Sequence, residues 1–255
     1  MKLRDYLIAK ERMAQVAERQ ATVRLRRAAR EMIAPVLEKI RYDLEGVEGS
    51  IDLLLDKEPI RKVFRWLYVD WAYKQMVWFN RHYKLESKSD LWMRRLEELF
   101  ETNSGEKITA IMGTTKEKIL PTIRNAVSWA ADGKSIDVIE GQIVKDVLAE
   151  GGAMSNGRAR TIARTEVIGA SNTATHEAVA SSGAKTEKRW VTGGSNIRDT
   201  HLAAEAMGWI PFEDMFQVGG VRMKHPSDPN AQGLPQAVAA EVINCKCVEV
   251  FRVVD

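Results

Sequence analysis

Apolar and polar residues in the first half of the chain recur with the spacing of helices. Residues 2–45 are rich in Ala, Leu, Arg and Glu, which favour helix, and Gly46 and Gly49 end this run. Pro35 lies inside the run and is expected to kink or divide the helix near Ile33. The pattern therefore predicts long helices separated by short breaks.

Further helices are predicted downstream. Pro59 suits the first turn of a second helix, which should run to about Tyr83. Three later starts are marked by residues that commonly cap helices: Ser89 with Asp90, for a helix through Phe100; Thr114 with Glu117, for a helix to Ala131; and Ser135, for a helix ended by Gly151 and Gly152.

The pattern changes in the second half. Ser155 is a good cap for a helix through about Ser182, which Gly183 would close. Short strand-like runs then follow, separated by glycine pairs and a stretch between two prolines: residues 187–192, 215–223 and 248–254.

These patterns predict an α+β protein with a boundary near 151–155. Residues 1–150 are expected to form a helical arm or bundle. Residues 155–255 are expected to form a smaller α+β domain.

Composition agrees with a folded protein. Hydrophobic residues make up 45% of the chain and charged residues 29%, and the net charge of +3 is too small to indicate nucleic-acid binding by itself. No apolar leader and no membrane span are visible, so a soluble protein of cytoplasmic origin is expected. Cys245 and Cys247 are the only cysteines and are poorly spaced for a mutual disulfide, which favours a reducing compartment.

Five short elements of the second half form an ordered set. They are Ile162-Ala-Arg-Thr-Glu166 followed by Asn172, Trp190 in a strand-like run, Arg198-Asp-Thr-His201, His225-Pro-Ser-Asp228, and Glu241-Val-Ile-Asn-Cys-Lys-Cys247. In this order they resemble the Mu F-like phage head morphogenesis family, whose members end in Asn-Cys-Arg-Cys after an Arg-x-x-His element. The resemblance covers residues 155–252. The chain departs from the family at two places. Lys246 replaces the family's arginine and lacks the planar guanidinium group that can form two parallel hydrogen bonds. After His201, Leu-Ala-Ala-Glu-Ala replaces a Leu-Asp-Gly turn.

The resemblance implies a minor capsid protein of a tailed bacteriophage, packaged inside the procapsid and bound to the portal protein. It further implies contact with double-stranded DNA, an effect on genome packaging or ejection, and scaffold or major capsid protein as other partners. The expected location is the interior of the virion head, after assembly in the host cytoplasm. The helical first half is consistent with an arm that docks on this assembly.

Polar residues of these elements are candidates for one structural cluster: Arg164, Glu166, Asn172, Arg198, His201 and Asn244. One interpretation places Arg164 or Glu166 in a pocket with His201. The interpretation that we favour is a buried polar clamp that joins the helix to the strands. A buried carboxylate needs a cation partner, and Arg198 or Arg164 would serve.

Two imidazoles and two thiols form a candidate tetrahedral zinc set: His201, His225, Cys245 and Cys247. The Cys-x-Cys spacing is tighter than in most zinc motifs, and the histidines lie far apart. The alternative is that the cysteines are small buried residues entering the last strand, while His201 bonds to backbone. No cofactor is expected apart from this candidate zinc ion.

A run of arginines without acids marks the first helix: Arg19, Arg24, Arg26, Arg27 and Arg30. Such a face suits DNA phosphates or an acidic portal surface. The alternative is an ordinary solvated helix face, because glutamates flank the run.

Aromatic residues recur every seven positions in the second helix, at Phe64, Trp71 and Trp78. This recurrence is typical of a seam that packs on another helix. We expect these aromatic residues to pack in the core. The alternative is an interface with a partner protein, because the helix carries more apolar surface than one face of a helical bundle usually buries.

The common catalytic motifs are absent: no phosphate-binding loop, no nucleophile elbow and no His-Glu-x-x-His. The sequence therefore predicts a protein that is not an enzyme. The alternative is a transferase-like enzyme that binds a nucleotide-like ligand through Arg164, Glu166 and His201.

Overall fold

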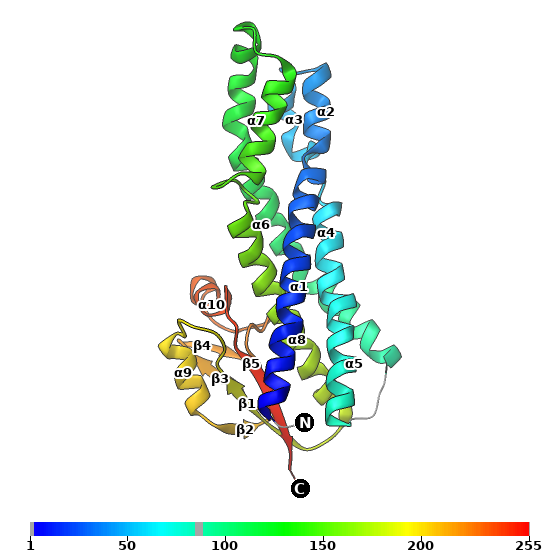
Figure 1. Ribbon diagram of the computed structural model, residues 1–255, viewed down its shortest axis with the longest axis vertical. Coiled ribbons are helices and arrows are strands. Elements are labelled where there is room, and N and C mark those ends of the chain that lie inside the picture. The colour runs from blue at the N-terminus through cyan, green and yellow to red at the C-terminus, as the bar shows by residue number, and fades with distance from the viewer. Residues whose placement is uncertain (1–2, 85–88, 255) are drawn as a thin grey trace. The chain divides into compact units, whose positions relative to one another are not determined.

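The computed structural model describes residues 3–84 and 89–254, and Figure 1 labels its α-helices and β-strands. The chain divides into two compact units. A helical unit comprises Gln20–Arg65 and Glu101–Arg160, and a sheet unit comprises Met1–Arg19, Trp66–Phe100 and Thr161–Asp255. Both units draw on residues from either side of the boundary predicted at 151–155, so they divide the chain differently from that prediction.

Helices account for most of the described chain, and several of them supply residues to both units. In chain order they are α1 (Leu3–Met32), α2 (Ala34–Tyr42), α3 (Val47–Leu54), α4 (Glu58–Arg65), the π-helix η1 (Trp66–Trp71), α5 (Ala72–Tyr83), α6 (Ser89–Ala131), α7 (Ile136–Leu148), α8 (Asn156–Ser182), α9 (Asp199–Ala206) and α10 (Pro235–Val242).

The break predicted near Ile33 is confirmed, because α1 ends at Met32 and α2 begins at Ala34 with Pro35 in its first turn. Within the helical unit α1 buries small residues, among them Ala21 and Ala28, together with Leu25. Alanine spaced in this way on one face lets neighbouring helices approach closely.

One predicted helix start is wrong. Thr114 was expected to cap a new helix, but α6 runs through it for 43 residues without a break. The Thr114 hydroxyl donates to the carbonyl of Ala110, the bond that a threonine makes inside a helix and not at its start. The capping role predicted for Ser89 and Asp90 concerns side chains outside those that the structure describes.

The second predicted helix, which was expected from Pro59 to about Tyr83, is interrupted by the π-helix η1. A π-turn holds more residues than an α-turn, so seven-residue recurrence does not continue as one straight seam across it. Phe64 is buried in the helical unit, whereas Trp71 and Trp78 are half-buried in the sheet unit. Trp78 stacks on Tyr6 of α1 with ring centroids 5.0 Å apart.

The sheet unit contains a three-stranded antiparallel sheet of order β2-β1-β5 and a separate hairpin, β3-β4. Its strands are β1 (Thr186–Val191), β2 (Trp209–Pro211), β3 (Phe216–Val218), β4 (Val221–Met223) and β5 (Val248–Val253). The three predicted strand regions are confirmed, and Gly219 and Gly220 make the predicted turn between β3 and β4. The α+β fold class is therefore confirmed.

Helix α8 is the central element of the sheet unit. Ser155 caps it as predicted, because its hydroxyl oxygen lies 3.4 Å from the backbone nitrogen of Arg158. Every residue from Glu166 to His176 is buried, so polar and apolar side chains alike face protein. The polar side chains of this stretch therefore need partners inside the fold. In the described part of the chain, none of the helices has both the length and the apolar character needed to cross a membrane.

Candidate functional site

Asn172 is the meeting point of three chain segments in the sheet unit. Its side-chain amide donates to the carbonyls of Pro226, at 3.1 Å, and Cys247, at 3.0 Å. Its amide oxygen accepts from the ammonium of Lys10 at 3.1 Å. One fully buried side chain thus ties α8 to α1, to the loop after β4 and to the start of β5.

Arg164 makes a second tie. Its guanidinium forms a two-point contact with the carboxylate of Glu18, at 2.9 and 3.1 Å, and donates to the Asn244 side chain at 2.7 Å. Asn244 has a left-handed backbone (φ 61°), which asparagine tolerates better than most residues, and its N–H donates to Thr165. These contacts hold the loop before Cys245 against α8.

Glu166 and Arg198 have separate roles from Arg164. The buried carboxylate of Glu166 accepts from the Tyr68 hydroxyl at 2.5 Å. Arg198 donates to the carbonyls of Glu241 and Ile243, which lie at the end of α10. These contacts differ from the pairing that the sequence suggested for Glu166, because Arg164 pairs with Glu18 and Arg198 bonds to backbone.

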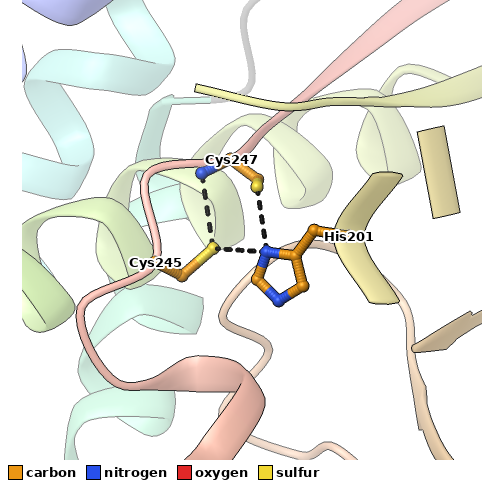
Figure 2. A group of neighbouring side chains, drawn as sticks. All are labelled: His201, Cys245 and Cys247. Atoms are coloured by element: carbon orange, nitrogen blue, oxygen red, sulfur yellow. Dashed lines mark hydrogen bonds between the residues drawn. The ribbon is translucent and has the colours of Figure 1, made fainter. Parts of the chain in front are cut away.

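His201 faces both cysteines (Figure 2). Its Nδ1 lies 3.2 Å from Sγ of Cys247 and 3.8 Å from Sγ of Cys245, and all three residues are only 2% exposed. His201 comes from α9, whereas the cysteines lie on the segment that leads into β5. The ligand atoms of these three residues all lie within 4.8 Å of one another.

The opposite ring nitrogen of His201 faces a carboxylate. Nε2 lies 3.0 Å from Oε2 of Glu241, a close electrostatic contact whose direction is not that of a hydrogen bond. Thr200 donates its hydroxyl to the same oxygen at 2.8 Å. The imidazole is thus held between two thiols on one side and an acid on the other.

The two thiols differ in acidity. A hydrogen bond from the Cys247 thiol lowers the pKa of Cys245 to about 5, with help from His201 and against the effect of burial. The pKa of Cys247 is raised by the same thiol hydrogen bond and by burial. Two cysteine sulfurs and one imidazole nitrogen form a soft donor set.

Gly193 fixes the position of the cysteine segment. A Cβ atom at Gly193 would lie 2.4 Å from the carbonyl oxygen of Lys246, which no side chain could accept without a shift of backbone. The loop after β1 therefore approaches the Cys-x-Cys segment, here called the cysteine loop (residues 244–247), as closely as backbone allows.

His225 does not join this group. Its Nδ1 lies 3.1 Å from the carbonyl of Pro226, its Nε2 lies 3.5 Å from the Thr173 hydroxyl, and its ring lies 5.1 Å from that of His176. Among the described residues, the four-residue zinc set suggested by the sequence is therefore reduced to His201, Cys245 and Cys247.

A buried ionic cluster centred on Glu249 was missed in the sequence. Its fully buried carboxylate lies 3.1 Å from Nδ1 of His176 and 3.8 Å from the ammonium of Lys188, which also donates to the carbonyl of Lys224. The pattern of β1 could have revealed this cluster, because successive residues of a strand face opposite sides of the sheet. Lys188 therefore faces the same buried side as Trp190. The sheet register also places Glu249 opposite Trp190.

The candidate DNA-contact residues of α1 separate into two groups. Arg19, Arg24, Arg27 and Arg30 are exposed. Arg26 is half-buried and donates to the carbonyl of Leu148, the last residue of α7. Four of the five predicted arginines therefore remain accessible to a partner, while Arg26 stabilises the end of a helix.

Comparison with known proteins identifies the chain's relatives. The sequence matches the family described as "Phage Mu protein F like protein" over residues 105–250, more than half of its length. The chain belongs to this family. The match extends upstream of the predicted resemblance and includes α7 and much of α6.

A second comparison finds a bacterial relative. The chain is 30% identical over 162 residues to "Uncharacterized protein YqbB" of Bacillus subtilis (strain 168), a match that covers 62% of this chain and 45% of that protein. The matched region thus covers less than half of the length of that relative. No solved structure matches the chain significantly.

Proposed function

We propose that this protein is a minor capsid component of a tailed bacteriophage, packaged inside the procapsid and bound to the portal. The observation that carries the proposal is the family match over residues 105–250, since family membership supports a role in phage head morphogenesis. The site geometry agrees with a structural role. Arg164, Glu166 and His201, the residues of the enzyme alternative, are each engaged by different protein partners.

The helical unit is the part that we assign to portal docking. It exposes large apolar side chains that a purely solvated surface does not need: Tyr42 at the end of α2 is 82% exposed and Leu53 on α3 is 90% exposed. Exposed aromatic and aliphatic anchors are typical of protein interfaces. Portal, scaffold or major capsid protein are the candidate partners, and the head interior is the proposed location.

The docking proposal is tested by co-purification of the full chain with the portal protein. Wild type is expected in a fixed ratio to portal, and Tyr42→Ser with Leu53→Ser should lower the recovered fraction at least several-fold. Leu234→Ser, at a residue 74% exposed in the sheet unit, is the matched control and should bind as wild type does. A chain absent from both virions and procapsids would refute the proposal.

DNA contact is assigned to the exposed arginines of α1. The proposal predicts that affinity for double-stranded DNA falls linearly with salt on logarithmic axes, because counterions are released. Changing Arg24, Arg27 and Arg30 together to Gln should reduce that slope by roughly 2 to 3, at about 0.9 per lost phosphate contact. The control is a triple variant with the same loss of charge, in which the exposed residues Arg4, Arg12 and Lys74 are changed to Gln. Equal slopes for the two triple variants would remove the arginine run from the interface.

A further inference from the structure

We propose that His201, Cys245 and Cys247 bind one zinc-like soft divalent ion, with Glu241 as the acid that orients the histidine. This assignment is independent of the role in the phage head. It rests on three observations: the mutual distances of the donor atoms, the contact on the far side of the imidazole, and the burial of all three side chains.

The donor atoms have nearly the spacing that a tetrahedral ion requires. Zinc–sulfur bonds of about 2.3 Å and zinc–nitrogen bonds of about 2.0 Å place a sulfur and a nitrogen ligand about 3.5 Å apart. Nδ1 of His201 lies 3.2 and 3.8 Å from the two sulfurs. Adjustments of a few tenths of an ångström are enough to place an ion between them, and Figure 2 shows both sulfurs next to the same ring nitrogen of His201.

His201 has an acid where a metal-bound histidine needs one. A ligating imidazole almost always donates its other ring N–H to a carboxylate or carbonyl, which fixes the ring and makes the ligand more basic. Glu241 lies 3.0 Å from Nε2 of His201, and Thr200 bonds the same carboxylate oxygen. A small rotation of the ring or of Glu241 is needed to form that bond here, because the present contact lacks the direction of a hydrogen bond.

The donor set selects the ion. Two thiols and one imidazole favour soft or borderline metals such as zinc, whereas magnesium and calcium require oxygen ligands. Three protein ligands leave the fourth tetrahedral position to water or another exogenous ligand. Glu241 cannot fill it while it contacts the nitrogen opposite the thiols.

The competing explanation is that both cysteines are simply small core residues. They do belong to the apolar cluster that contains Trp190, Phe216 and Val218. Packing alone, however, does not explain why an imidazole and an anchored carboxylate are aligned with the sulfurs. The two explanations differ in whether a thiolate–metal bond forms, which can be measured directly.

The test is a cobalt titration of the full-length protein. Cobalt bound to thiolate gives charge-transfer absorption, and Cys245 and Cys247 are the only cysteines in the chain, so such a band can arise only here. We expect the band to saturate at one cobalt per chain and to disappear when one equivalent of zinc is added. Elemental analysis of protein prepared with zinc should likewise give one ion per chain.

Substitutions distinguish the proposed metal ligands from the residues around them. Cys245→Ser and Cys247→Ser should abolish the band, whereas Glu241→Gln should keep it and weaken affinity about 10- to 100-fold, as loss of an orienting partner does. His82→Gln removes an imidazole of α5 outside the site and should bind as wild type does. The wild-type titration decides the matter even if a cysteine variant fails to fold: no thiolate band, or a zinc content near zero after loading, overturns the proposal.

Discussion

Lys10 is a lysine with almost no access to solvent. It is only 2% exposed, and its ammonium bonds to the amide oxygen of Asn172. Burial lowers the pKa of Lys10 to about 8, although the nearby carboxylate of Glu249 works in the other direction. The charge of this side chain therefore costs the folded state stability at neutral pH.

The sign of the resulting pH dependence follows from the lowered pKa. Between pH 8 and pH 10.5 the unfolded chain binds more protons at this site than the folded chain, so the contribution of Lys10 to the free energy of unfolding should rise with pH in that window and stay constant below it. Over the full window the gain is about 3 kcal/mol. Lys10→Met should reduce the rise in that window by about this amount, as measured by urea unfolding at pH values from neutral to the upper part of that window, while Lys188, whose pKa burial also lowers, still contributes a rise. Lys74→Met, at an exposed lysine, is the control, and an unchanged profile in Lys10→Met would contradict the burial argument.

At the scale of elements, the helical unit depends on small residues in α1. Ala21 is fully buried, and a leucine there would force extra methyl and methylene groups into a packed region. Ala21→Leu should lower the free energy of unfolding by about 1 to 3 kcal/mol, the usual cost of overpacking. Denaturant unfolding measures it. Val23→Leu, further along the helix at a position 69% exposed, should change stability little, and equal losses in both variants would contradict close packing of this face.

Elements with strong local signals could be predicted from the sequence. The break between α1 and α2, the start of α8 at Ser155 and the turn at Gly219 and Gly220 all follow from residues with fixed backbone preferences. The continuous α6 could not be predicted from caps, because its buried positions include Ser104 and Thr115, which interrupt the apolar pattern. Tertiary burial, and not local preference, selects helix there.

The site could be predicted only in part for the same reason. His201 and the cysteines stood out by residue type, and Asn172, Arg164 and Asn244 by the family resemblance. Lys10 and Glu249 lie in segments whose local pattern indicates an ordinary helix and an ordinary strand. The role of Lys10 depends on a partner 162 residues away in the sequence, which no local spacing encodes.

At the scale of the whole molecule, the two compact units share continuous helices. α1, α6 and α8 each contribute residues to both units. If one unit unfolded alone, each of these helices would have to end in its middle. The turns next to the new end would then lose backbone hydrogen bonds to the unfolded part. Helix cooperativity thus favours joint unfolding of the two units.

This sharing predicts a single unfolding transition. Circular dichroism, which reports all helices, and fluorescence, which is dominated by tryptophans of the sheet unit such as Trp92 and Trp190, should give the same urea midpoint. Trp129, which lies in the helical unit, offers a second check: Trp129→Phe should leave the midpoint of the fluorescence transition in place. Two separated midpoints would contradict the prediction.

The contact between Gly193 and Lys246 has a consequence for how this protein can vary over evolution. A methyl group at residue 193 would displace the backbone between the two thiols while leaving every donor atom chemically intact. The spacing of the sulfurs is thus governed by a residue that contributes no side chain at all. Among natural variants, a change at this glycine should accompany loss or rearrangement of the Cys-x-Cys pair, even where the histidine on α9 is kept.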